Sequence, residues 1–319
     1  MSVYPSYLKA HKSGQLKKTA DQLFLSLESC QICPRRCKVN RLADKLGFCK
    51  TTKNIKIYSF MRHHGEEPPV SGTKGSGTIF FSHCNMGCVY CQNYEFSQQG
   101  RGRQHSFQEL AEIMLKLQAD GCHNINLVTP THVLPQILKS LELAIAAGLE
   151  IPLVYNTSGY ESAEIIKLLD GIVDIYLSDS RYGDDKLAEE LSLAPRYVKF
   201  NQEALLEMHR QVGVAEFTKE GLIKKGLIIR HLVLPNKVSA TEEIMKFIAQ
   251  KLSKETYISL MSQYLPYYKA SANTKINRRI NHDEYEEARQ ILERYHLANG
   301  WIQESYGQER FAGVNIKPV

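Results

Sequence analysis

The chain has 319 residues, of which 43% are hydrophobic and 23% are charged. This length fits one large domain or two ordinary ones, and the composition is that of a soluble globular protein. The formal net charge of +6 is spread along the chain, so it supports nucleic-acid binding only weakly. No apolar run is long enough to span a bilayer and no secretory signal is visible, so we expect a cytoplasmic protein outside the membrane.

The amino-terminal part predicts a helix followed by a small metal-binding module. Within residues 1–29, leucines recur at roughly helical spacing. Residues 30–49 are basic and contain four cysteines, Cys30, Cys33, Cys37 and Cys49. Four thiolates suffice to close a tetrahedral zinc site or to cap a [4Fe–4S] cluster, and we favour zinc or another structural metal. Four free thiols remain the alternative, and Arg35, Arg36, Lys38 and Arg41 form a basic stripe that is a weak nucleic-acid signal.

Residues 50–75 read as an irregular loop, because Gly, Pro and Ser are frequent there. Glu66 and Glu67 in this loop are candidates for lining a substrate entrance. We therefore divide the chain into residues 1–75, which hold the helix, the metal module and a linker, and residues 76–319, which hold the main domain.

From residue 77 onward, continuous apolar strands alternate with amphipathic helices. The predicted strands lie at 77–84, 124–130, 151–159, 172–180, 226–235 and 256–266. The predicted helices lie at 106–121, 135–148, 162–171, 184–212, 241–252 and 283–297. This alternation indicates six βα units and a parallel sheet that is buried on both faces. Polar residues follow each strand, at the edge where α/β proteins place their chemistry.

A loop with three cysteines, Cys84, Cys88 and Cys91, follows the first of these strands in the spacing C-x3-C-x2-C. Three thiolates on a short loop can cap three irons of one [4Fe–4S] cube, which leaves the fourth iron open to a substrate or cofactor. A structural zinc site normally needs four ligands, so a three-cysteine zinc site is the less favoured interpretation. The eighth cysteine, Cys122, is predicted to be a buried core thiol.

This motif, with Tyr90 before its third cysteine, resembles the signature of the radical S-adenosylmethionine (SAM) superfamily. The segments CPRRCKVNR, GEEPPVSGTKGSGTIFFSHCNMGCVYCQN, NINLVTPTHV, VYNTSGY and RHLVLP are similar to the pyruvate formate-lyase activating enzyme homologues of the PflX-type branch. The resemblance covers most of residues 30–270. It implies an α/β fold with a partial (β/α)6 TIM-like barrel, a [4Fe–4S] cluster on Cys84, Cys88 and Cys91, and SAM as the second cofactor.

The resemblance also implies cofactor contacts at the strand ends. Thr129, Thr131 and His132 replace the Gly-Gly-Glu-like stretch that binds the methionyl amine, so the acidic ligand is missing; a helix N-cap is the other interpretation of Thr131. Further cofactor contacts are predicted for Tyr90, Asn156, Ser158, Gly159, Asp179, Arg181 and Arg230. Arg181 stands where a cation pairs with the cofactor carboxylate, and Asp179 orients it. His231 is predicted to be structural, while Met208, Arg210 and Gln211 are candidates without an assigned role.

The expected function is reductive cleavage of SAM to a 5′-deoxyadenosyl radical that abstracts hydrogen. The target implied by the resemblance is the backbone glycine of a glycyl radical enzyme. The alternatives are radical modification of another peptide or small molecule, and a non-catalytic iron–sulfur or zinc protein that binds a partner. A flavodoxin or ferredoxin is the expected electron donor, and a protein substrate is a possible partner; no membrane and no nucleic-acid partner is expected.

Overall fold

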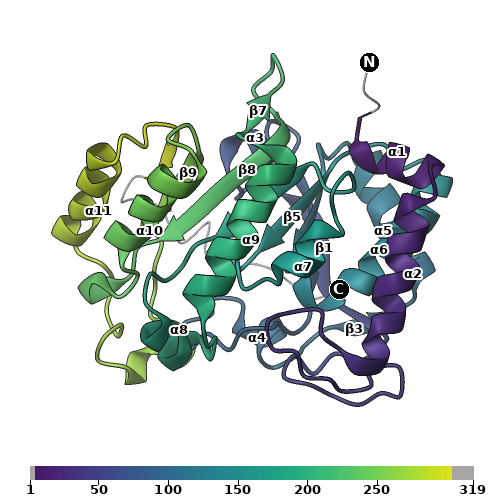
Figure 1. Cartoon of the computed structure of the whole chain (residues 1–319), viewed down its shortest axis with the longest axis horizontal. Helices are drawn as coiled ribbons and strands as arrows, with labels where there is room; N and C mark the ends of the chain where they lie inside the picture. The colour runs from purple at the N-terminus through teal and green to yellow at the C-terminus, as the bar shows by residue number, and fades with distance from the viewer. Residues whose placement is uncertain (1–3, 304–319) are drawn as a thin grey trace.

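The computed structural model describes residues 4–303, which form an open, mostly parallel sheet covered by helices (Figure 1). Its strand order is β10-β9-β8-β6-β5-β4-β2-β1-β3. The successive parallel strands are β2 (Ser76–Phe81), β4 (Ile125–Val128), β5 (Leu153–Thr157), β6 (Ile175–Asp179), β8 (Ile223–Leu232) and β9 (Tyr257–Met261). Because these are the six strands predicted from sequence, the α/β fold with a partial barrel is confirmed.

Shorter strands complete the sheet, and sequence reasoning missed them. β1 (Ile55–His63) lies antiparallel to β2, so part of the segment 50–75 that was predicted to be irregular is a strand. β3 (Arg103–His105) pairs with β1, β7 (Glu216–Phe217) pairs with β8, and β10 (Gly300–Ile302) pairs with β9. The Gly- and Pro-rich loop after β1 masked its alternating apolar pattern, in which Ile55 and Ile57 are fully buried. The division of the chain at residue 75 stays a prediction, and its last part, 304–319, lies outside the described residues.

Helices connect the parallel strands as predicted, with one exception. The helices are α5 (Phe107–Ala119), α6 (Leu134–Ala146), α7 (Ala163–Lys167), α8 (Asp185–Ser192), α9 (Tyr197–Val212), α10 (Thr241–Phe247) and α11 (His282–Arg294). The single helix expected over 184–212 is wrong. The chain breaks between α8 and α9, where Leu193 and Arg196 are left-handed and Pro195 cannot continue a helix. One turn of π-helix, Ile248–Leu252, extends α10. Further short turns are α3 (Pro68–Ser71) and α4 (Tyr94–Ser97).

The amino-terminal helix predicted within residues 1–29 is a pair, α1 (Ser6–Lys12) and α2 (Gln15–Leu25), broken at left-handed Gly14. The pair packs on α6 at one side of the molecule, far from α11 (Figure 1). Leu16, Leu23 and Leu27 join the main hydrophobic core, as does Cys122, which confirms the prediction of a buried thiol. Among residues 4–303, no helix has the length and apolar character needed to cross a membrane.

The cysteine-rich module, residues 30–49, consists of turns and irregular backbone. Arg41 fixes this module to the barrel. The Arg41 side chain is almost fully buried, with 1% of its surface exposed. Its Nη2 donates to the carbonyl of Thr52 at 3.0 Å and to that of His132 at 2.9 Å. The module is therefore packed against the loop that follows β4, close to the carboxyl ends of the strands.

Candidate active site

The three-cysteine loop follows β2 at the carboxyl edge of the sheet. Its backbone is held by the end of α8, because Gly87 N donates to the Ser192 carbonyl and Val89 N to the Leu191 carbonyl, both at 2.8 Å. His83, just before the first cysteine, has a φ of 71°, in the left-handed region that residues other than glycine seldom adopt. The loop is thus shaped by its anchors rather than by regular secondary structure.

Each thiol of this loop has polar neighbours. Ser192 Oγ donates to Cys88 Sγ at 2.9 Å, and Arg181 Nη1 donates to the same sulfur at 3.4 Å. Cys91 Sγ lies 3.1 Å from Ser97 Oγ. Burial raises the pKa of the Cys84 thiol to about 12 and that of Cys91 to about 11. Coordination to a cation is what ionises such thiols near neutral pH, so this donor set fits an iron–sulfur cluster.

Among residues 4–303, no three His, Cys, Asp or Glu side chains are grouped to hold a single metal ion. Each thiolate of a [4Fe–4S] cube binds a different iron, so its ligands stand further apart than the ligands of one ion. The spacing of Cys84, Cys88 and Cys91 is consistent with ligands of a cube.

A cavity of about 740 Å³ opens beside this loop and fills the barrel. Seven of the predicted cluster and cofactor contacts line it: Tyr90, Cys91, Thr129, Asn156, Asp179, Arg181 and Arg230. They come from the loop after β2 and from the ends of β4, β5, β6 and β8. The parallel sheet thus brings residues more than a hundred positions apart in the chain to one chamber.

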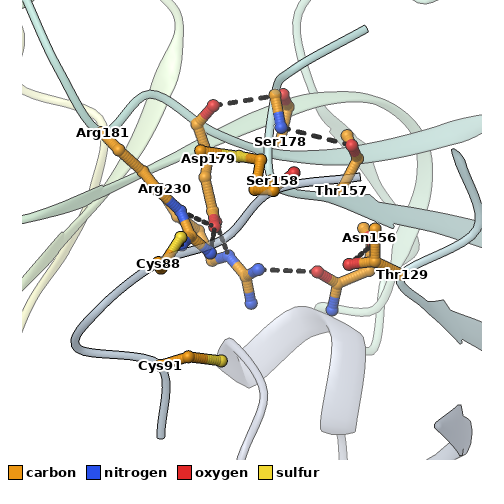
Figure 2. Close-up of polar contacts among 12 residues, drawn as sticks. Cys88, Cys91, Thr129, Asn156, Thr157, Ser158, Ser178, Asp179, Arg181 and Arg230 are labelled. Carbon is orange, nitrogen blue, oxygen red and sulfur yellow. Dashed lines mark hydrogen bonds and ion pairs between the residues drawn. The ribbon is translucent and has the colours of Figure 1, made fainter. Parts of the chain in front are cut away.

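Charged side chains form a continuous network along one wall of the cavity (Figure 2). Asp179 Oδ2 accepts from Arg181 Nε at 2.9 Å and Nη2 at 2.5 Å, while its Oδ1 accepts from Arg230 Nε at 2.8 Å. Arg230 Nη2 donates to Asn156 Oδ1 at 2.6 Å. Burial alone would raise the pKa of Asp179, but the charges of Arg230 and Arg181 hold it below its ordinary value. Asp179 is therefore an ionised carboxylate that fixes both guanidinium groups.

Glu66 and Glu67 form the floor of this cavity. β1 is antiparallel to β2, with His63 opposite Ser76, so the loop that carries both glutamates enters from the amino ends of the parallel strands. Glu66 accepts from Asn126 Nδ2 at 2.9 Å and from Arg230 Nη1 at 3.3 Å. Burial raises the pKa of both carboxyl groups. Both carboxyl groups line the cavity from the amino ends of the parallel strands, and their role at a substrate entrance stays a prediction.

Four predicted contact residues do not line the cavity: Thr131, His132, Ser158 and Gly159. The Thr131 hydroxyl donates to Glu161, and α6 begins only at Leu134, so Thr131 is not its N-cap. His132 is buried and its Nε2 lies 2.9 Å from the Ser82 carbonyl. This geometry does not support a hydrogen bond from either residue to the methionyl group.

Ser158 and Gly159 lie where β5 ends. Ser158 Oγ is buried without a hydrogen-bond partner, so it keeps a free polar atom at the edge of the site. Gly159 has a φ of +76°, and a Cβ there would stand 2.1 Å from the Asp179 carbonyl oxygen. The absence of a side chain at Gly159 lets β5 and β6 end close together.

The remaining candidates have structural surroundings. Tyr90 lines the cavity, yet its hydroxyl lies 2.7 Å from that of Tyr182. His231 is buried between the Ser180 carbonyl and the Thr241 hydroxyl, as predicted for a structural histidine. Met208, Arg210 and Gln211 lie on α9 away from the cavity; Met208 belongs to the main core, and Arg210 pairs with Asp170 and Glu207.

Comparison with known proteins identifies the superfamily. A family model described as "Radical SAM superfamily" matches residues 78–248, which is more than half of the chain. The "Uncharacterized protein MJ0674" of Methanocaldococcus jannaschii is 35% identical over 280 residues, which cover 85% of this chain and 76% of that protein.

Solved structures with similar folds have low sequence identity. They include the maturase HydG from Carboxydothermus hydrogenoformans (12% identity, TM-score 0.48, 99% of this chain and 72% of that chain) and TYW1 with a lysine-pyruvate adduct bound (11%, 0.46, 73% and 77%). Methylornithine synthase (PylB) is another (14%, 0.46, 76% and 70%). On the strength of the family match and of the three-cysteine loop beside the cavity, the chain belongs to the radical SAM superfamily, whose members bind a [4Fe–4S] cluster and SAM.

Proposed function

We propose that this chain is an enzyme that cleaves SAM reductively and uses the resulting radical to abstract hydrogen from a substrate held in the barrel. The observation that carries the proposal is that Cys91 and Tyr90 of the cysteine loop line the same 740 Å³ cavity as Asp179, Arg181 and Arg230. When bound, the cluster on Cys84, Cys88 and Cys91 supplies the electron for cleavage, and SAM supplies the radical. The chain supplies binding, orientation and exclusion of water.

Arg181 is the residue that we assign to the carboxylate of SAM. It is pinned by two hydrogen bonds to Asp179, and its Nη1 lies 3.4 Å from Cys88 Sγ. A guanidinium in that position offers its remaining N–H groups beside a cluster ligand, where a carboxylate bound to the open iron would meet them. Asp179 acts as the positioning residue, and Thr129, Asn156 and the unpaired Ser158 hydroxyl are the candidates for the ribose and the amine.

The cavity also offers unpaired amide oxygens that suit a peptide. Asn93 Oδ1 and Gln263 Oε1 belong to residues that line it, and both atoms are buried without a partner. Such acceptors gain most from N–H donors, which a peptide backbone presents at every residue. These unpaired acceptors, together with the similarity to the PflX-type activating enzymes, support a peptide substrate. We propose that the hydrogen donor is the backbone glycine of a glycyl radical enzyme. A flavodoxin or ferredoxin is the class of reductant that we propose.

A cleavage assay tests the first part of the proposal. We expect the anaerobically reconstituted protein to form 5′-deoxyadenosine from SAM and dithionite, measured by liquid chromatography. Cys84→Ala, Cys88→Ala and Cys91→Ala are each expected to abolish the product, and Cys122→Ala, which changes a buried thiol outside the site, is the matched control. Absence of product with an intact cluster would leave the non-catalytic alternative in place, and activity in all three variants would remove the cluster assignment.

Isotope transfer tests the glycine target separately. Pyruvate formate-lyase labelled with α-deuterated glycine is mixed with this protein, SAM and reductant. We expect deuterium in the 5′-deoxyadenosine and a glycyl radical signal in electron paramagnetic resonance. Cleavage without deuterium transfer would contradict this target and would favour another peptide or a small molecule.

A further inference from the structure

The four cysteines of the amino-terminal module converge on one small cavity. Cys30, Cys33, Cys37 and Cys49 all line it, although the segment that carries them has no helix or strand. The other charged or titratable side chains around it are Arg35, Arg36, Arg41 and His132. This cavity is separate from the barrel chamber, with which it shares no lining residue.

Two polar atoms at this cavity are buried without partners. Arg41 Nε and His132 Nδ1 make no hydrogen bond, although the two side chains are only 1% and 2% exposed. His132 Nε2 faces the Ser82 carbonyl and must donate to it, so Nδ1 carries a free lone pair. Leaving such atoms unpaired costs free energy, and both belong to side chains that line a chamber with four sulfurs. The unpaired Arg41 N–H donor suits a bound group that presents electron-rich atoms such as sulfur in the cavity.

The grouping of the four sulfurs indicates which group fits. A structural zinc site needs its ligands drawn together around one ion. Among residues 4–303, no three His, Cys, Asp or Glu side chains are grouped to hold a single metal ion, so the four thiols do not have the arrangement of zinc ligands. In a cube each thiolate binds its own iron, and the ligands stand further apart. This departs from the preference for zinc that the sequence alone suggested.

Arg35 joins this module to the three-cysteine loop. Its Nε donates to the carbonyl of Asn85, the residue after Cys84, at 2.7 Å. Its guanidinium also lies 3.2 Å from the centre of the Phe48 ring, next to Cys49. One cation therefore contacts residues next to both groups of cysteines, and its charge interacts with Cys33 and Cys37 on one side and with Cys84 on the other.

We propose that Cys30, Cys33, Cys37 and Cys49 bind a second iron–sulfur cluster, adjacent to the one on the three-cysteine loop. The four thiolates cap its irons, Arg41 donates toward its sulfurs through Nη1, which already lies 3.6 Å from Cys30 Sγ, and His132 closes the chamber.

Metal analysis of the full chain tests this proposal without any activity measurement. After anaerobic reconstitution with iron and sulfide, we expect about eight irons and eight sulfides per wild-type chain. The variant Cys84→Ala/Cys88→Ala/Cys91→Ala is expected to keep about four of each, with the Mössbauer spectrum of a [4Fe–4S] cluster. Cys33→Ser is expected to lose the second cluster only, and Cys122→Ser is the matched control with both.

About four irons in the wild type, with either zinc or no metal in the module, would overturn the proposal. If the triple variant does not fold, the wild-type iron count and the comparison of Cys33→Ser with Cys122→Ser still decide the question. RNA binding by the basic stripe is not needed for any of these outcomes.

Discussion

Arg181 contacts both the charged wall of the cavity and the cysteine loop. It reaches Asp179 through two nitrogens and Cys88 Sγ through a third, which a lysine ammonium could not do at once. This geometry is the reason why an arginine suits the end of β6 better than a lysine would.

The substitution Arg181→Lys is expected to raise the KM for SAM about tenfold, which corresponds to about 1.4 kcal/mol of lost binding. Lysine keeps the charge but loses the fork that Asp179 holds. Steady-state cleavage kinetics at equal cluster content measure the change. Arg294→Lys, in a surface ion pair with Glu242, is the matched control. An unchanged KM would contradict the assignment of Arg181 to the carboxylate.

Glu161 is a buried carboxyl group with an unusual proton affinity. It accepts hydrogen bonds from Thr131 and Thr157, and Tyr155 OH lies 3.5 Å away. Burial raises its pKa from 4.5 to about 7. The folded chain therefore binds more protons than the unfolded chain between these values, and the free energy of unfolding should fall as pH rises through that window.

Glu161→Gln replaces this carboxyl group by a neutral amide. The slope of the free energy of unfolding against pH should then become shallower by up to about 1.4 kcal/mol per pH unit between about pH 4.5 and pH 7. Urea unfolding at a series of pH values measures it. The control Glu164→Gln removes an exposed carboxylate three residues away and should keep the wild-type slope. An identical slope in Glu161→Gln would show that the carboxyl group does not titrate in this window.

At the scale of elements, the turn after β5 depends on a glycine for space. An alanine at Gly159 would meet the Asp179 carbonyl oxygen at 2.1 Å and Asn201 Nδ2 at 2.3 Å. Gly14, between α1 and α2, has the same φ of +76° but nothing within 4 Å of an added Cβ. At Gly14 an added methyl group would bring backbone strain alone, whereas at Gly159 it would bring the same strain together with a steric clash.

We expect Gly159→Ala to lower the free energy of unfolding by about 3 kcal/mol or more, and Gly14→Ala by about 1 kcal/mol. Equilibrium unfolding in urea measures both. Equal losses would mean that strain alone explains the glycine, and that the approach of β5 to β6 tolerates an added methyl group.

The alternation of apolar strands and amphipathic helices predicted the six parallel strands, because strands buried on both faces leave a strong pattern. The edge strands β3, β7 and β10 have two or three residues each, too few for any period to show. The strand-end rule predicted Asp179 and Arg181, whose placement follows from topology, and the charge that interrupts the apolar strand at 226–235 predicted Arg230. That rule could not predict the floor position of Glu66 and Glu67, since that depends on β1 pairing antiparallel with β2.

At the scale of the whole molecule, Arg41 couples the cysteine module to the barrel. Arg41→Met keeps an unbranched apolar stem but removes the donors to the Thr52 and His132 carbonyls, which should cost about 3 kcal/mol. We expect one unfolding transition, shifted as a unit, in both circular dichroism and the fluorescence of Trp301.

Trp301 is the single tryptophan, and it lies in β10 at the opposite edge of the sheet from β1 and β3. Its fluorescence therefore reports on the far side of the molecule. The control Arg36→Met loses one exposed ion pair with Glu164 and should shift little. A shift in circular dichroism that leaves the Trp301 transition in place would mean that the module unfolds independently.

The loop of residues 64–75, which carries Glu66 and Glu67, reaches the barrel from the end opposite to the cysteines, and this has an evolutionary consequence. The three cysteines and the predicted SAM contacts of this chain lie at one rim of the barrel, whereas the loop between β1 and β2 contributes the base of the chamber without contributing a thiolate. Changes in that loop can accumulate while the rim stays constant. We therefore expect relatives that act on different substrates to differ in sequence at residues 64–75. Exchanging that segment between two relatives should exchange their substrate selectivity.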